Sequence, residues 1–155
     1  MLPYLKDMEK LIMKNCKLTD QSAALMIKGA LGGHSSLRHI DFTGIYMGRH
    51  FVNTLAEILK AFPNCLEELI LADLRPTVSI GDLIDALMHA ESLEYLDLSE
   101  NTFNFQAATS LANLVSKTSS LEYLSLKACS LRDSCAQTIL DALMVNKSIK
   151  YLNLS

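Results

Sequence analysis

Residue types that could support catalysis occur in this chain, but their spacing matches no catalytic or metal-binding arrangement. The four histidines are scattered along the sequence, at His34, His39, His50 and His89. The sequence contains no phosphate-binding loop of the GxxxxGK or GxGxxG type, no HExxH helix and no GxSxG nucleophile turn. Because no pair of carboxylates is marked for acid–base work either, we expect no catalytic residue, no cofactor, no metal and no enzymatic activity.

The four cysteines, Cys16, Cys65, Cys129 and Cys135, show neither a CxxC pair nor the Cys/His spacing of a zinc site. Free cysteine behaves as a small hydrophobic residue, so we expect four reduced and mostly buried thiols. Such thiols are typical of an intracellular, cytoplasmic protein, because disulfides persist in oxidising compartments. A disulfide framework is the second alternative.

Length and composition indicate one soluble globular array. The chain has 155 residues, of which 50% are hydrophobic and 20% charged, and its formal net charge is −3. Basic residues are not in excess, so we expect no nucleic-acid partner. No apolar run reaches the roughly 18 residues of a membrane span. The first ten residues lack the pattern of a secretory signal, so we expect no membrane association.

One stretch carries the main structural signal, Leu93 to Phe103, which reads LEYLDLSENTF. It follows the pattern L-x-x-L-x-L-x-x-N-x-L. Leu96 and Leu98 alternate with Asp97, which predicts a short strand with one face turned inward. The amide of Asn101 can then bond backbone groups where the strand ends. One such unit cannot bury its own apolar face, so the pattern predicts neighbouring units.

The same pattern recurs along the whole chain. The first apolar positions of successive copies are 29, 29, 27, 28 and 28 residues apart, at Met8, Leu37, Leu66, Leu93, Leu121 and Ile149. Between the strands, apolar residues at helical spacing predict one helix per repeat, as in the set Ile80, Leu83, Ile84 and Leu87. Five strand–helix units predict a parallel sheet with all helices on one side, curved so that the strands line the concave face.

Several positions depart from this regularity. Ile45 and Leu74 stand where Asn101 stands in its own repeat, so we expect local distortion at those two turns. Residues 75–79 are expected to form an irregular loop, and Gly29, Gly32 and Gly33 to end the first helix. Asp133 is expected to cap the fifth helix. His50 is expected at a helix start, with no residue near it in sequence to pair with it.

Units of about 28 residues with a helical second half resemble the ribonuclease-inhibitor-like class of leucine-rich repeats. The resemblance covers nearly all of the chain. It implies an α/β leucine-rich-repeat solenoid, a right-handed βα superhelix with a curved parallel sheet on the concave side and helices on the convex side. We expect residues 1–155 to form a single array of about five full repeats plus a truncated sixth, as part of a longer protein.

The residues predicted to point outward from the strands form columns across the sheet. One column contains three of the five tyrosines, Tyr95, Tyr123 and Tyr151, which should form a row of stacked rings. Asp73, Asp97 and Glu100 provide an acidic neighbourhood. Tyrosine is favoured at interfaces, so these six residues are the predicted partner-binding site. The alternative is a stripe that only stabilises the sheet.

Three functions follow from this pattern. The first is a module that binds a protein partner, with a basic or mixed-charge segment, on its concave face in a scaffold or regulatory role. The second is an architectural segment that packs through its open ends, including the exposed edge of the last strand. The third is implied only by the resemblance, whose members include nuclease inhibitors, GTPase activators, immune sensors and actin regulators.

Overall fold

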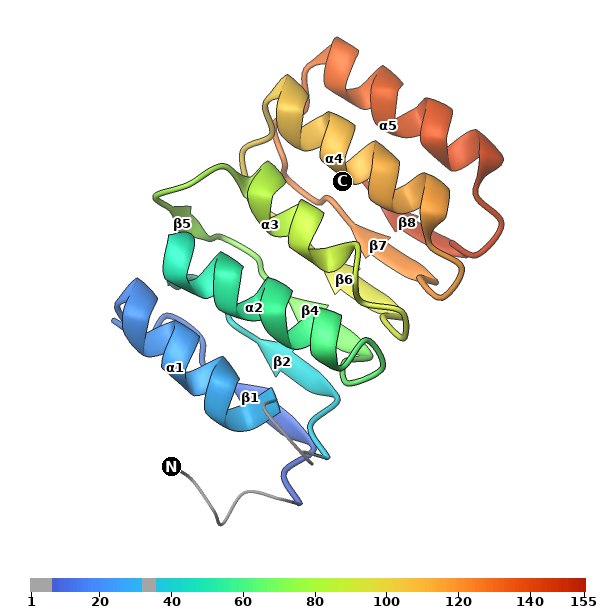
Figure 1. The fold of residues 1–155 in the computed structure, drawn as a ribbon. Coiled ribbons are helices and arrows are strands. Elements are labelled where there is room, and N and C mark those ends of the chain that lie inside the picture. The colour runs from blue at the N-terminus through green and yellow to red at the C-terminus, as the bar shows by residue number, and fades with distance from the viewer. Residues whose placement is uncertain (1–6, 32–35) are drawn as a thin grey trace.

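Strands and helices alternate throughout the computed structural model, which describes residues 7–31 and 36–155 (Figure 1). The elements are, in chain order, β1 (Lys10–Ile12), α1 (Asp20–Leu31), β2 (His39–Asp41), β3 (Tyr46–Met47), α2 (Arg49–Ala61), β4 (Glu68–Ile70), β5 (Arg75–Pro76), α3 (Ile80–Leu87), β6 (Tyr95–Asp97), α4 (Phe105–Lys117), β7 (Tyr123–Ser125), α5 (Asp133–Val145) and β8 (Tyr151–Asn153).

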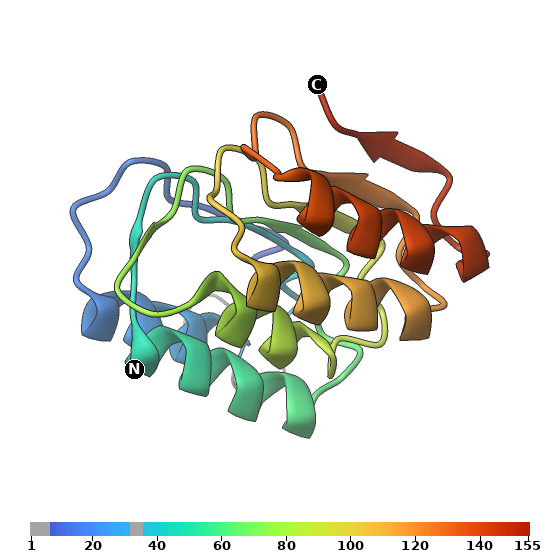
Figure 2. The ribbon, with the colours of Figure 1, turned by 90° about the horizontal axis from the view of Figure 1, so that it is seen from above.

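The main sheet in the described part of the chain has six parallel strands in the order β1-β2-β4-β6-β7-β8. Its register keeps the repeats in phase, so that Lys10, His39, Glu68, Tyr95, Tyr123 and Tyr151 stand side by side. Figure 2 shows the helices in one layer and the strands in another. The chain is therefore an α/β repeat solenoid, as the sequence predicts.

The core lies between these two layers. Leu96 in the middle of β6 is fully buried, as is Leu98 directly after it. Leu111 and Val115 of α4 are also fully buried and complete the same layer. Burying a leucine side chain stabilises a fold by about 1.5–3 kcal/mol. The repeated leucines therefore bind each unit to its neighbours, which explains why a short three-residue strand is stable here.

The turn after each strand uses one backbone conformation. The residue before the Asn101 position has a positive φ in five successive repeats, at Asn15, Gly44, Asp73, Glu100 and Ala128. The expectation of distorted turns at Ile45 and Leu74 is therefore wrong. Leu74 has no side-chain amide to bond its own turn. Asn101 of the next repeat bonds this turn instead, because the Asn101 Oδ1 accepts from the Leu74 backbone amide at 3.0 Å.

Residues 75–79 form the irregular loop expected from the sequence only in part, since residues 77–79 lie outside helix and strand and the first two residues do not. Arg75 and Pro76 form β5, which pairs in parallel with β3 in a separate two-stranded sheet. The Arg75 amide donates to the Ile45 carbonyl at 3.0 Å, so this ladder also binds the turn at Ile45. Ser79 then caps α3 by accepting from the Gly81 amide at 3.1 Å.

Two expectations about helix ends need comment. Asp133 does not cap α5: it is the first residue of the helix, and the capping position belongs to Arg132, which makes no side-chain cap bond. Gly29 lies inside α1, which runs to Leu31. The expected helix-ending residues Gly32 and Gly33, together with His34, lie outside the described residues.

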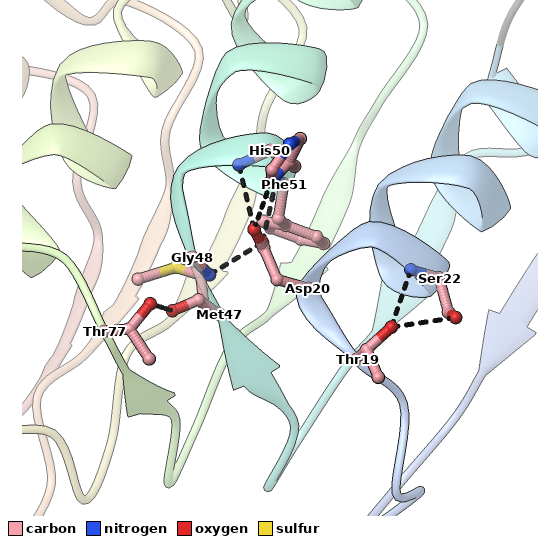
Figure 3. Close-up of polar contacts among 8 residues, drawn as sticks. All are labelled: Thr19, Asp20, Ser22, Met47, Gly48, His50, Phe51 and Thr77. Atoms are coloured by element: carbon pink, nitrogen blue, oxygen red, sulfur yellow. Dashed lines mark hydrogen bonds and ion pairs between the residues drawn. The ribbon is translucent and has the colours of Figure 1, made fainter.

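The start of α2 is capped by a residue of the preceding repeat (Figure 3). The Asp20 carboxylate accepts from the backbone amides of Gly48 at 2.8 Å, His50 at 3.0 Å and Phe51 at 2.9 Å. The His50 ring nitrogen Nδ1 lies 3.0 Å from Asp20 Oδ2, so His50 has a partner in space although it has none near it in sequence. Gly48 itself provides no side-chain cap, which leaves this task to Asp20.

Candidate functional site

The tyrosine ladder, Tyr95, Tyr123 and Tyr151, lies at the start of β6, β7 and β8 on the sheet face that the helices do not cover, here called the strand face. The register pairs Tyr95 with Tyr123 and Tyr123 with Tyr151. The first two rings are stacked, with centroids 4.3 Å apart and an interplanar angle of 7°. The third is tilted by 35° at 6.4 Å, and Tyr151 is 65% exposed. The predicted row of rings is present, with its last ring turned aside.

The environment of Tyr95 disfavours negative charge. The pKa of Tyr95 is raised to about 12. Partial burial is the largest cause, and the neighbouring Tyr123 and the carboxylates of Asp97 and Glu68 add to it. The phenol therefore keeps its proton and acts as a neutral hydroxyl at any physiological pH. The carboxylates of Asp97 and Glu68 favour an incoming positive charge at the same place, whereas burial disfavours a charge of either sign.

Asp97 lies beside the ladder, two residues after Tyr95 on the same strand. Its Oδ1 accepts from the Ser99 amide at 2.8 Å and from the Ser99 hydroxyl. The Ser99 hydroxyl also lies 2.8 Å from that of Ser125, which links two repeats. These bonds orient the carboxylate, and one of its oxygens has no hydrogen-bond partner within the described segments.

Asp73 and Glu100 lie farther from the tyrosine ladder. Both occupy the left-handed position of a turn, beyond the ends of β4 and β6. The turns are neighbours, since the Asp73 amide donates to the Ser99 carbonyl at 3.0 Å and the Glu100 amide to the Lys127 carbonyl at 2.8 Å. The structure therefore brings Asp97 close to the tyrosines and places Asp73 and Glu100 at the opposite edge of the strand face.

A row of carboxylates precedes the tyrosines and was missed from the sequence. Glu67, Glu94 and Glu122 directly precede the neighbouring strands β4, β6 and β7. They are joined by 2.8 Å bonds from the Glu94 amide to the Glu67 carbonyl and from the Glu122 amide to the Glu94 carbonyl. Arg38 pairs with Glu67 at 3.6 Å and Lys150 with Glu122 at 2.7 Å. Glu94 has no ion-pair partner in the described part of the chain. The available signal was the glutamate that follows Leu66, Leu93 and Leu121 in each repeat.

Charges toward the N-terminal end of the strand face are largely paired. Glu68, which stands opposite Tyr95, contacts the His39 ring nitrogen Nδ1. Asp41 is buried and accepts from Lys14 at 2.9 Å and from the Thr43 hydroxyl at 2.6 Å. The C-terminal half of the face, around the tyrosine ladder, therefore keeps more free negative charge.

The bonds of Asn101 explain why the repeat pattern has a polar residue at this turn. The Asn101 side-chain nitrogen donates to the carbonyls of Leu71 and Leu98 at 2.8 Å and of Ser99 at 3.2 Å. Cys129 occupies the equivalent position in the next repeat, where its Sγ donates to the Leu98 carbonyl at 3.1 Å. Each of these side chains closes its own turn and binds the preceding repeat, so both are structural.

The cysteines and acidic residues form no chemical centre within residues 7–31 and 36–155. No group of three or more His, Cys, Asp or Glu side chains there could hold a metal ion. The thiols of Cys16, Cys65, Cys129 and Cys135 are free, with Cys129 and Cys135 buried and the other two partly exposed. Burial raises the pKa of the Cys65 and Cys129 thiols, which makes both less reactive. No described helix has the length and apolar character needed to cross a membrane.

Comparison with known proteins identifies one of the repeats. Residues 92–114 match the family model described as Leucine Rich Repeat, a segment that contains β6 and most of α4. No curated protein matches the chain. The matched segment has the same strand, turn and helix as its neighbours, with which it shares one sheet register. The chain therefore contains a leucine-rich repeat, set within an α/β repeat solenoid.

Proposed function

We propose that this chain is a protein-binding module that holds a partner on its strand face, in a scaffold or regulatory role and without chemistry of its own. The observation that carries the proposal is the row of partly exposed rings in the tyrosine ladder. Tyrosines supply large contact areas at low entropic cost and keep a hydroxyl for hydrogen bonding. Solenoids of this kind typically bind partners on an extended, concave surface.

The partner carries a basic or mixed-charge segment. Asp97 lies beside the ladder, and Asp73 and Glu100 lie at the edge of the same face, so long cationic side chains can lay their apolar stems on the rings and extend their charges toward carboxylates. A net charge of −3 argues against nucleic acid. The free thiols support a reducing, cytoplasmic location. Repeats of 27 to 29 residues, counted between register-paired strands, support the ribonuclease-inhibitor-like subtype.

The double substitution Tyr95→Ala and Tyr123→Ala tests this proposal. It should weaken partner binding by about 2 kcal/mol or more, because aromatic anchors supply much of the binding energy of an interface. A partner is first isolated with the intact protein, and its affinity for both proteins is then measured by titration calorimetry. The matched control is Tyr46→Ala, since Tyr46 is 46% exposed but lies in β3, outside the main sheet. An unchanged affinity for a folded double variant would remove the proposal.

A second candidate function is architectural, and a different surface supports it. The outer side of α5 and β8 exposes apolar side chains, namely Leu140, Met144, Val145, Leu152 and Leu154. In this role the chain packs through that surface against another part of a larger assembly, and the strand face has no partner. The two candidates are therefore separated by which surface a substitution must change to affect assembly.

A further inference from the structure

The tyrosine ladder has carboxylates around it, and we propose that it binds an arginine side chain from an extended segment of the partner protein. This inference rests on the proposed function, because it assigns a chemistry to the partner of the strand face. Two features of the structure support it, the exposed aromatic row and the arrangement of Glu68, Glu94 and Asp97 around Tyr95.

Three carboxylates lie next to Tyr95 in the sequence or in the sheet register, and one of them, Glu68, already contacts His39. Glu94 directly precedes the tyrosine, Asp97 follows it by two residues on the same strand, and Glu68 stands opposite it on β4. Adjacent strands are about 4.8 Å apart, and two residues along a strand span about 6.6 Å. A cationic group at the surface of the Tyr95 ring is therefore within reach of more than one carboxylate.

The glutamate row beside the ladder has one cation fewer than it has carboxylates. Arg38 pairs with Glu67 at one end and Lys150 with Glu122 at the other. Glu94, between them, forms no ion pair among the residues that the structure describes, and only the more distant charge of Lys150 acts on it. The nearby exposed cation Lys127 lies past the end of β7, beside the turn that contains Glu100. A cation supplied by another protein completes the row at Glu94.

The shape of the ladder determines how that side chain lies. Rings 4.3 Å apart leave no space between Tyr95 and Tyr123, so the incoming side chain lies on the ladder and not between its first two rings. The carboxylates of Asp97 and Glu68, which act on the Tyr95 hydroxyl, favour a positive charge at this position. The guanidinium stays at the exposed surface of the ladder, because burial disfavours a charge of either sign.

Arginine fits these groups better than lysine. Its guanidinium carries five donors in a rigid fork, so it can bond two carboxylates while its apolar stem packs on the rings. The lysine ammonium is a compact and strongly hydrated point charge that gains less from carboxylates placed on different sides. The strand face is thus expected to discriminate between two residues of equal charge.

The test uses two short peptides, acetyl-Gly-Arg-Gly-Arg-Gly-amide and its counterpart with lysine at both basic positions, titrated into isotope-labelled protein and followed by NMR. The arginine peptide should shift the amide signals of β6 and β7, and its affinity should exceed that of the lysine peptide by about three- to five-fold. Glu94→Gln should lower the affinity for the arginine peptide by about three- to five-fold.

The matched control is Glu57→Gln, which makes the same change at an exposed position of α2, in the helix layer. It should leave arginine-peptide affinity unchanged. Equal affinity for both peptides, or equal losses in the Glu94 and Glu57 variants, overturns the arginine assignment. That outcome is distinct from failure of the proposed function, which is decided separately by the binding of the intact partner to the double tyrosine variant.

Discussion

Asp20 shows how a single side chain can join two repeats. Its carboxylate bonds three backbone amides at the start of α2, including that of Gly48, 28 residues later. These amides have no partner within their own helix. Although partial burial opposes the change, bonds from the Phe51 and His50 amides, the His50 ring and the Gly48 amide together lower the pKa of Asp20 below its usual 3.8.

Asp20→Ala should lower the free energy of unfolding by about 1–2 kcal/mol, as measured by urea denaturation near neutral pH, because a helix cap is lost. Since the pKa of Asp20 is lower in the folded state, its contribution is present above pH 4 or so and is lost as the pH falls through the folded pKa. The difference between wild type and variant should therefore shrink in acid.

The control for this substitution is Asp133→Ala, which removes an acidic residue from the first turn of α5 where no side-chain cap bond exists. Only the interaction with the helix dipole is lost there, so the decrease should be a few tenths of a kcal/mol, roughly 0.3 to 0.5. Equal losses at Asp20 and Asp133 would contradict the capping role of Asp20.

The sequence predicted some of these single residues and not others, for a physical reason. The bonds of Asn101 to its own turn follow from local geometry, and so does the position of Tyr95, since both depend on neighbours within one repeat. Asp20 acts through residues about one repeat away, and Glu94 lies in a row formed by three repeats, so both features become visible only when the repeats are stacked. Glu94 also belongs to the binding site that we propose on the strand face, of which the sequence predicted only a part.

The turn after each strand needs a residue in the left-handed backbone conformation, and alanine is poorly suited to it at Ala128. Its φ is 55°, where a side chain with a Cβ is strained. Ala128→Gly should therefore raise the free energy of unfolding by roughly 0.5–1 kcal/mol, measured by urea denaturation, because relief of strain exceeds the added freedom of the unfolded chain.

Ala112→Gly provides the opposite control, because Ala112 lies inside α4. There glycine should lower stability by about 1 kcal/mol. If both substitutions destabilised the protein equally, the turn at Ala128 would not be strained in solution. The pair therefore separates the effect of glycine itself from the effect of the backbone conformation.

Element types were predictable because the apolar period differs between strand and helix. The strand predicted from the alternation of Leu96 and Leu98 is confirmed by β6. The helix predicted from the spacing of Ile80, Leu83, Ile84 and Leu87 is confirmed by α3. The strand at Arg75–Pro76 was not predictable, because its partner Tyr46–Met47 belongs to the preceding repeat and both strands have two residues. Such short strands carry too little periodicity to be read from sequence.

The whole molecule exposes its apolar side chains unevenly, and this supports an expectation about association. The outer side of α5 and β8 carries Met144 at 85% exposure and Leu154 at 50%. The protein should self-associate reversibly at about 10 to 100 µM, as measured by sedimentation velocity, because an apolar surface next to a strand edge favours contact. The double substitution Met144→Lys and Leu154→Lys should restore a monomer.

Two lysines introduced elsewhere control for net charge. Leu25 and Phe105 are also exposed, at 65% and 61%, but lie in α1 and at the start of α4. Leu25→Lys with Phe105→Lys should leave the association unchanged. A wild-type protein that stays monomeric over this concentration range would count against the architectural candidate and leave the strand face as the remaining interaction surface.

The bonds that run between repeats also restrict how the gene could change in length. Asp20 reaches 28 residues forward to Gly48, and Asn101 reaches 30 residues back to Leu71. An insertion or deletion of a few codons would shift these groups away from their partners, whereas the gain or loss of a complete repeat would present an equivalent neighbour. Natural length variants of this protein should therefore differ by multiples of the repeat.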